Sequence, residues 1–249
     1  MLLRLLWPLR LLRHLRPISC LACLLLLAAP AHAERVAPAD EPAFVQTLKQ
    51  LSVKILRGSG PGTQFVGSGF TWVSRGRAMA ITNYHVAALG LAEGPGPQGL
   101  HVGYAAPVNW HAATHTLAVP GADLAIIETD VVAPQDNPYT LGVAAEGDTV
   151  YSISYDQDEF QQASPVVYKG TVKAIVPLLF PSSVLLLDPP FPPDVVKAYL
   201  MQGSDCVYGA SGGMVLNAKG ELVAYNAGTI GNGFCVAVAI QEATRALAR

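Results

Sequence analysis

The stretch Gly209-Ala210-Ser211-Gly212-Gly213 places a serine hydroxyl inside a glycine-rich turn. Such a turn can present a nucleophile together with backbone N–H groups for an oxyanion, because glycine lets a peptide unit face a substrate closely. With 23 glycines in the chain, an ordinary turn is the alternative interpretation. Catalysis is favoured because His85 and Asp123 precede Ser211, in an order that puts a base and then a carboxylate before the nucleophile.

Each of these residues has a predicted role. Hydrolysis by an alcohol needs a base, a group that orients the base, and donors for the developing oxyanion. His85 follows a candidate strand directly, so we expect it on a short helical turn at the strand end. Asp123 begins the apolar run 124–127, where a histidine ring N–H would satisfy a buried carboxylate. The backbone N–H groups of Gly209 and Ser211 would form the oxyanion hole.

Plainer alternatives exist for the same side chains. His85 could be a satisfied structural histidine, and Asp123 an exposed turn residue. The structural interpretation is the one we favour for the other histidines of the domain, namely His101, His111 and His115. Two further aspartates are poorer candidates because turn residues surround them, namely Asp130 and Asp136.

Short apolar or alternating runs separated by turn residues predict an all-β fold. Twelve runs are candidate strands: Ser52–Leu56, Phe65–Val73, Ala78–Ile81, Leu100–Tyr104, Asp123–Glu128, Thr149–Ser154, Thr171–Val176, Val184–Leu187, Val195–Met201, Met214–Asn217, Glu221–Tyr225 and Phe234–Val238. Twelve is the number that two six-stranded antiparallel β-barrels require. Helical spacing predicts two short helices, at Phe44–Gln50 and Gln241–Arg249. We place one domain at 44–249, with a first barrel at about 44–130, a connection at Val131–Pro138 and a second barrel at about 139–240.

Residues 1–33 have the pattern of a cleavable export signal. Four arginines precede an apolar run at Ile18–Ala29, and Ala31-His32-Ala33 forms a cleavage site before Glu34. The run has about 12 residues, whereas a membrane-spanning helix needs about 20. We therefore expect a periplasmic or secreted protein with no stable membrane anchor after cleavage, and a short linker at residues 34–43. An uncleaved anchor is the alternative.

Composition limits the partners. Without the signal, 12 basic residues stand against 18 acidic ones, a formal charge of −6, and no basic face for a nucleic acid is expected. No metal-ligand cluster or phosphate-binding loop stands out, so neither a metal nor a cofactor is predicted. The acidic segment Asp156–Glu159 is interpreted as a surface loop because its spacing matches no calcium cage. The oligomeric state is left open.

Two cysteines, Cys206 and Cys235, remain after the signal is removed. In an oxidising compartment they can form one intramolecular disulfide, which would stabilise the fold by about 3 to 4 kcal/mol in the chain-entropy model. Two buried free thiols are the alternative.

Five strings carry a resemblance to a known family: GSGF (67–70), TNYHV (82–86), DLAII (123–127), GDTVYSI (147–153) and GASGGMVLNAKGELVAYNAG (209–228). They resemble the trypsin-like peptidase domain of the high-temperature-requirement (HtrA) serine proteases. The resemblance implies a double six-stranded β-barrel with the active site between the barrels. It also implies a catalytic triad of His85, Asp123 and Ser211, an oxyanion hole at Gly209 and Ser211, and protein or peptide substrates.

The chain also departs from that family. Its members usually continue into a peptide-binding PDZ module, for which no residues follow Arg249. Residue 210 is alanine, where the family usually has asparagine and zymogen-activated relatives have aspartate. We therefore do not expect activation by an inserted N-terminal amine.

The resemblance gives two hypotheses for the substrate pocket. Asp205 stands six residues before Ser211, where trypsin-like proteases place the carboxylate that binds Lys or Arg. Similarity to the HtrA family instead predicts a small or apolar P1 side chain, with Tyr225, Asn226 and Ala227 as the far wall of the pocket. The functional prediction is an exported serine endopeptidase that acts through an acyl-enzyme. The alternatives are a peptide-binding or chaperone-like module with little or no proteolysis, and an esterase.

Overall fold

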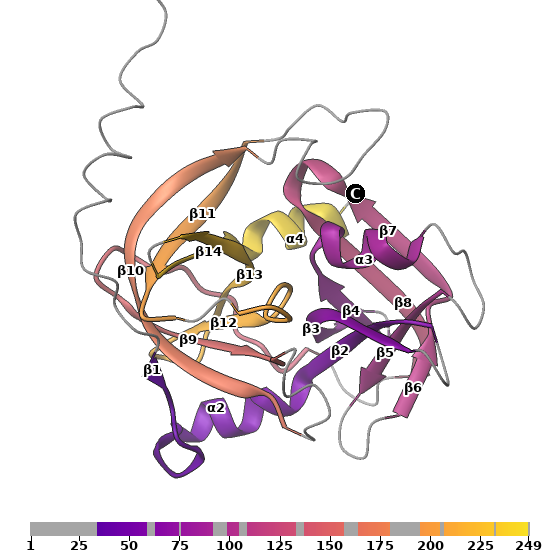
Figure 1. The fold of residues 1–249 in the computed structure, drawn as a ribbon, viewed down its shortest axis with the longest axis horizontal. Helices are drawn as coiled ribbons and strands as arrows, with labels where there is room; N and C mark the ends of the chain where they lie inside the picture. Colours follow the sequence, from indigo (N-terminus) through magenta and orange to yellow (C-terminus); the bar gives the residue numbers. More distant parts are fainter. Residues whose placement is uncertain are drawn as a thin grey trace, which may run out of the picture.

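Two curled antiparallel sheets lie side by side in the protein (Figure 1). The computed structural model describes residues 34–58, 63–74, 76–91, 99–104, 109–132, 137–156, 164–179, 195–204, 207–231 and 233–248. The predicted signal, the candidate strand Val184–Leu187 and the residues Asp205 and Cys206 lie outside this part of the chain. No helix among the described residues is both long and apolar enough to cross a bilayer.

The first sheet contains seven strands in the order β6-β5-β2-β3-β4-β8-β7. Their bounds are β2 (Ser52–Arg57), β3 (Gln64–Ser74), β4 (Arg77–Thr82), β5 (Leu100–Tyr104), β6 (Asn109–Ala112), β7 (His115–Val119) and β8 (Leu124–Val132). All pairings in it are antiparallel, and the sheet curls, but among the described strands β6 and β7 do not pair with each other. Five of its strands were predicted; β6 and β7 were not.

The second sheet closes into a six-stranded barrel. Its strands are β9 (Thr149–Ser154), β10 (Val166–Leu179), β11 (Val195–Gln202), β12 (Met214–Asn217), β13 (Leu222–Gly231) and β14 (Phe234–Ala239). The order β10-β11-β14-β13-β12-β9 is closed by a pairing of β9 with β10. A short strand, β1 (Glu34–Arg35), also pairs antiparallel with β10, opposite Tyr168 and Lys169. The all-β, two-barrel class with a short terminal helix is therefore confirmed, although only the second sheet is closed by strand pairing.

The helical segments are short and stand before, between or after the strands. A 3₁₀ turn, η2 (Pro38–Asp40), is followed by α2 (Ala43–Leu48) and η3 (Lys49–Leu51), which lead into β2. In the first half, α3 (Tyr84–Leu91) follows β4, and η4 (Pro120–Ala122) precedes β8. The C-terminal helix α4 (Ile240–Leu247) buries Ile240, Ala243 and Ala246, a spacing of three residues that puts them on one face. Both predicted helices are confirmed.

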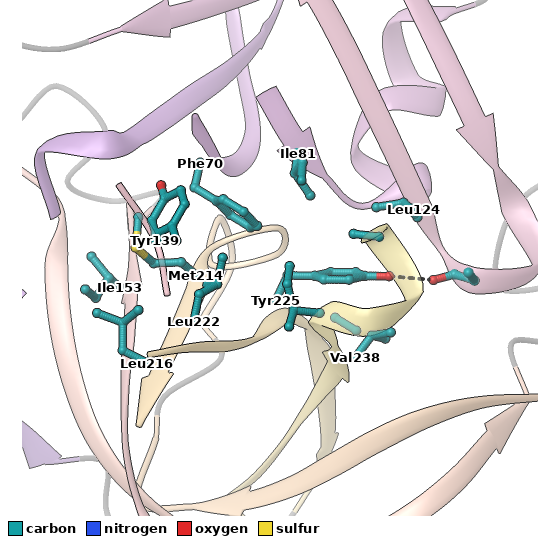
Figure 2. Packing of buried hydrophobic residues seen from close by; sticks show 14 of the residues in the cluster. Phe70, Ile81, Leu124, Tyr139, Ile153, Met214, Leu216, Leu222, Tyr225 and Val238 are labelled. Carbon is teal, nitrogen blue, oxygen red and sulfur yellow. Dashed lines mark hydrogen bonds between the residues drawn. The ribbon is translucent and has the colours of Figure 1, made fainter. Parts of the chain in front are cut away.

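One hydrophobic core spans the two sheets (Figure 2). From the first sheet it contains Phe70, Ile81 and Leu124, and from the second it contains Met214, Tyr225 and Val238, together with the buried face of α4. Figure 2 shows the Tyr225 ring among these apolar side chains, with its hydroxyl directed at the chain just before β8. The sheets are thus packed against each other by apolar side chains, which fixes the loops at their junction.

Candidate active site

His85 lies at the start of α3, directly after the end of β4. The carbonyl of Asn83 accepts the first helical hydrogen bond, from the N–H of Ala87 at 3.2 Å. Val86 and Ala87 are fully buried and anchor the helix on the first sheet, whereas the His85 side chain is 32% exposed. The helix start therefore holds its backbone inside the protein and leaves the imidazole accessible.

Asp123 is the capping residue of η4, and β8 begins one residue later, at Leu124. The prediction that the strand starts at Asp123 is therefore wrong by one residue. Its φ of 47° is the only positive value among the described residues other than glycine. Aspartate tolerates this left-handed conformation better than most residues do. The turn directs a carboxylate that is only 1% exposed toward α3.

The Asp123 carboxylate is satisfied by His85. Oδ1 accepts the His85 backbone N–H at 3.0 Å, and the His85 ring nitrogen Nδ1 lies 2.9 Å from Oδ2 and 3.1 Å from Oδ1. Because an ionised carboxylate only accepts hydrogen bonds, Nδ1 carries the proton in this arrangement. Nε2 is then the nitrogen with a free lone pair. The Nδ2 group of Asn83 also donates to the Asp123 backbone carbonyl at 3.1 Å, which fixes the turn from the other side.

Ser211 lies in the turn between β11 and β12, where Gly209 and Gly212 have φ values of 98° and 85°. The carbonyl of Ala210 accepts the N–H of Gly213 at 3.0 Å. Because a trans peptide points its C=O and N–H in opposite directions, the N–H of Ser211 faces away from Gly213. In the described part of the chain, the N–H groups of Gly209 and Ser211 donate to no acceptor. They are the two groups predicted to bind an oxyanion.

Gly67 of β3 connects the surroundings of His85 and Ser211. A Cβ at Gly67 would lie 2.7 Å from the Val86 side chain and 3.2 Å from the Ser211 carbonyl oxygen. Val86, the residue after His85, and Ser211 therefore both pack against Gly67. A residue with a Cβ would collide with them there, so the close packing requires glycine. Between described atoms, no hydrogen bond joins the Ser211 hydroxyl to His85. Such bonds are often long before a substrate binds.

The predicted pocket residues on β13 are largely buried. Asn226 is fully buried and donates from Nδ2 to Ser152 Oγ at 2.7 Å. Ala227 is 9% exposed. The Tyr225 ring lies in the core between the sheets, so a contact between this residue and a substrate would have to come from its backbone. Their pocket role stays a prediction.

The predicted disulfide and the predicted P1 carboxylate cannot be placed, because Cys206 and Asp205 lie outside the described residues. Cys235 is 1% exposed, and its Sγ lies 3.0 Å from the carbonyl oxygen of Ser204. Ser204 comes two residues before Cys206 in the sequence. This position is compatible with the predicted bridge.

Tyr225 supports the turn that carries Asp123 through its hydroxyl, which donates to the Ala122 carbonyl at 3.0 Å. Burial raises the pKa of this phenol well above its usual value, and the nearby Asp123 carboxylate adds to the effect. The hydroxyl therefore remains a donor at all ordinary pH values. The bond ties β13 of the second sheet to the residue before Asp123.

We expect Tyr225→Phe to lower the free energy of unfolding by about 1 to 2 kcal/mol, because it leaves the buried Ala122 carbonyl without this donor. Urea denaturation followed by tryptophan fluorescence measures the change. Tyr208→Phe is the matched control, since Tyr208 is 86% exposed and should change stability by less than about 0.5 kcal/mol. Equal stabilities of the two variants would contradict the expectation.

Two buried hydroxyls near Ser211 were not predicted as part of the site. Ser68 of β3 and Thr82 at the end of β4 are both fully buried. Thr82 Oγ1 donates to the Ser68 carbonyl at 2.6 Å, and the Ser68 N–H donates to the Ser211 carbonyl at 2.9 Å. The only sequence signal for them was their place in the strings GSGF and TNYHV.

Among the described residues, no group of three or more His, Cys, Asp or Glu side chains is arranged to hold a metal ion. A second His–Asp pair is present, with His111 Nδ1 2.7 Å from Asp130 Oδ1, but the Asp130 side chain is 73% exposed. It differs from the His85–Asp123 pair in burial rather than in distance.

The fold and the site define a class of protein: a two-barrel peptidase with a His–Asp pair on one sheet and a glycine-flanked serine on the other. Residues 67–224 match the trypsin-like peptidase domain, and the chain belongs to this family. It is a family of serine protease hydrolases, and the resemblance to trypsin-like serine proteases is thereby confirmed. No match was found among curated proteins.

Solved structures share the fold at low sequence identity. The active form of the Rv3671c protease from M. tuberculosis has a TM-score of 0.66 at 20% identity, covering 89% of this chain and 90% of that one. The MamO protease domain from Magnetospirillum magneticum has a TM-score of 0.61 at 19% identity, covering 80% and 96%. A serine endoprotease from Yersinia pestis has a TM-score of 0.58 at 18% identity, covering 81% and 63%. These likenesses show a common architecture.

Proposed function

We propose that this protein is an exported serine endopeptidase that hydrolyses protein or peptide bonds through an acyl-enzyme. The observation that carries the proposal is the buried Asp123 carboxylate, which holds the partly exposed His85 ring by Nδ1 and leaves Nε2 without a hydrogen bond among the described atoms. A buried carboxylate that accepts a ring N–H fixes the tautomer and stabilises the imidazolium that forms when the ring takes a proton. The unoccupied N–H groups of Gly209 and Ser211 support the same proposal.

The proposed reaction has two halves. In the first, Ser211 Oγ attacks the peptide carbonyl carbon while His85 Nε2 takes the hydroxyl proton, and the N–H groups of Gly209 and Ser211 bind the oxyanion. The C–N bond then breaks as His85 returns the proton to the leaving amine, and the acyl group stays on Ser211. In the second half, His85 Nε2 takes a proton from water as the water oxygen attacks the ester carbon. The bond between the acyl carbon and Ser211 Oγ then breaks, His85 returns the proton to Oγ, and the acid is released.

Labelling with a fluorophosphonate probe tests this proposal without a known substrate. The probe forms a bond to a serine oxygen only where that oxygen is activated, and wild-type protein should be labelled on Ser211. Ser211→Ala should not be labelled, and Ser164→Ala, which removes an exposed serine hydroxyl elsewhere, should be labelled like the wild type. Absence of labelling in the wild type would favour a peptide-binding module on the same fold.

Two hypotheses describe the side chain that the substrate pocket would prefer at P1. A carboxylate from Asp205 would bind Lys or Arg, whereas a pocket closed by the β13 backbone would take a small or apolar side chain. A peptide-library cleavage profile separates them, because cleavage after Leu, Val or Ala with none after Lys or Arg would exclude the Asp205 hypothesis.

Export is proposed from the signal pattern of residues 1–33, and the fold is compatible with cleavage before Glu34. Glu34 pairs with β10, and its N–H donates to the Gly203 carbonyl at 2.9 Å, a bond that a new terminal amine can also make. We expect the mature protein to begin at Glu34 and to contain a Cys206–Cys235 disulfide. Intact mass spectrometry checks both, since reduction should add the mass of two hydrogens. Two alkylatable thiols in the unreduced, unfolded protein would exclude the bridge.

A further inference from the structure

Ser68 belongs to the first sheet, but its side-chain hydrogen bonds are to the second half of the chain. It is fully buried on β3, and its Oγ lies 2.7 Å from the carbonyl oxygen of Gly209. Ser68 Oγ also accepts the N–H of Tyr155, the residue just after β9, at 2.8 Å. A second carbonyl, that of Tyr155, is farther away at 3.3 Å. Because a serine hydroxyl has one proton, the shorter distance identifies Gly209 as its acceptor.

The backbone of Ser68 holds the other end of the same turn. Its N–H donates to the Ser211 carbonyl at 2.9 Å, and its carbonyl is itself fixed by Thr82 Oγ1 at 2.6 Å. Ser68 therefore binds the carbonyl groups of Gly209 and Ser211. The N–H groups of these same two residues donate to no acceptor in the described part of the chain.

The peptide unit between Gly209 and Ala210 is held at both ends. Its oxygen accepts the Ser68 hydroxyl, and its N–H, on Ala210, donates to the Val207 carbonyl at 3.0 Å. Gly209 has a φ of 98°, and glycine has no Cβ to restrict rotation about its own backbone bonds. The N–H groups of Gly209 and Ser211 belong to the peptide units directly before and directly after this one. By opposing rotation of the peptide unit between them from outside the turn, the Ser68 hydroxyl restrains the direction of both N–H groups.

We propose that Ser68 is a positioning residue that orients the oxyanion-binding N–H groups of the turn carrying Ser211, and that it does so only when the two sheets are packed together. This inference rests on the proposed function. Ser68 touches no substrate in this role. It acts by fixing Gly209 through Oγ and Ser211 through its backbone, with the Tyr155 N–H holding the hydroxyl in place.

The variants for a test remove the hydroxyl without touching the triad. Ser68→Ala removes both side-chain hydrogen bonds, and Ser68→Cys keeps nearly the same volume but supplies only a weak S–H donor. Loss of one oxyanion donor typically costs about 10² to 10³-fold in kcat, so misorientation of one should lower kcat by about 10-fold to 10²-fold. Ser52→Ala is the matched control, because Ser52 is equally buried on the neighbouring strand β2 and its Oγ has no partner among described atoms.

The full mature chain is used for three measurements: the rate of fluorophosphonate labelling, kcat and KM on one cleaved peptide, and the unfolding midpoint. We expect Ser68→Ala and Ser68→Cys to lower kcat and the labelling rate with KM nearly unchanged at temperatures where both are folded, while Ser52→Ala behaves as wild type. Labelling of either folded Ser68 variant at the wild-type rate would overturn the inference, as would an equal loss in Ser52→Ala. Wild-type protein that is not labelled on Ser211 would instead refute the proposed function.

Discussion

Ser211→Ala is expected to lower kcat for peptide hydrolysis by about 10⁴-fold or more, because it removes the proposed nucleophile while the rest of the site stays in place. The Ser211 hydroxyl makes no hydrogen bond within the described part of the chain, so its loss should leave the unfolding midpoint near that of the wild type. Initial rates on a fluorogenic peptide, measured beside thermal unfolding, check both statements.

The control for this variant is Ser164→Ala, which removes an exposed hydroxyl distant in sequence from the turn. It should retain wild-type kcat. Wild-type peptidase activity in Ser211→Ala would show that another group attacks the substrate, and would remove the basis of the proposed function.

Asp123→Asn should cost about 10⁴-fold in kcat with little loss of stability. Asparagine has nearly the same shape and also tolerates the φ of 47° at this position. An amide, however, offers one oxygen in place of two, and this oxygen already accepts the His85 backbone N–H. Its NH₂ group would then face Nδ1 of the ring, which favours the tautomer with the proton on Nε2. That tautomer cannot take the proton of Ser211.

The matched control is Asp130→Asn, which changes the exposed His111–Asp130 pair in the same way. It should leave kcat unchanged. Steady-state rates for both variants, with circular dichroism to confirm folding, decide the question. If Asp123→Asn kept kcat within about 10-fold of the wild type, Asp123 would not be the group that orients His85.

Apolar patterning accounts for much of the fold that could be predicted. Leu100–Tyr104, Thr149–Ser154 and Met214–Asn217 were predicted with their observed bounds, because these strands contain mostly buried residues. By contrast, β6 and β7 lie at the edges of the first sheet, and their residues are exposed or half-buried. A strand that has no buried face produces no period-two pattern, so both were missed.

The candidate site could also be predicted only in part from the sequence. His85, Asp123 and Ser211 were proposed from residue types, their order and the family resemblance. The hydrogen bonds between His85 and Asp123, however, depend on a left-handed turn at Asp123 that the local sequence does not predict. From the sequence, His111 and Asp130 were predicted to be poorer candidates, but only the structure shows that they also form a pair and that the Asp130 side chain is exposed whereas that of Asp123 is buried. Ser68 was missed as part of the site because its partners lie 87 and 141 positions away along the chain.

The core shared by the two sheets bears on when the protein can fold during synthesis. Phe70, Ile81 and Leu124 leave the ribosome well before Met214, Tyr225 and Val238, the residues they are grouped with in that core. Contacts between residues so distant in sequence form late, and a nascent first half keeps its apolar face uncovered until the last strands and α4 arrive. If the protein is exported as proposed, a chain still crossing a membrane would therefore have no working active site.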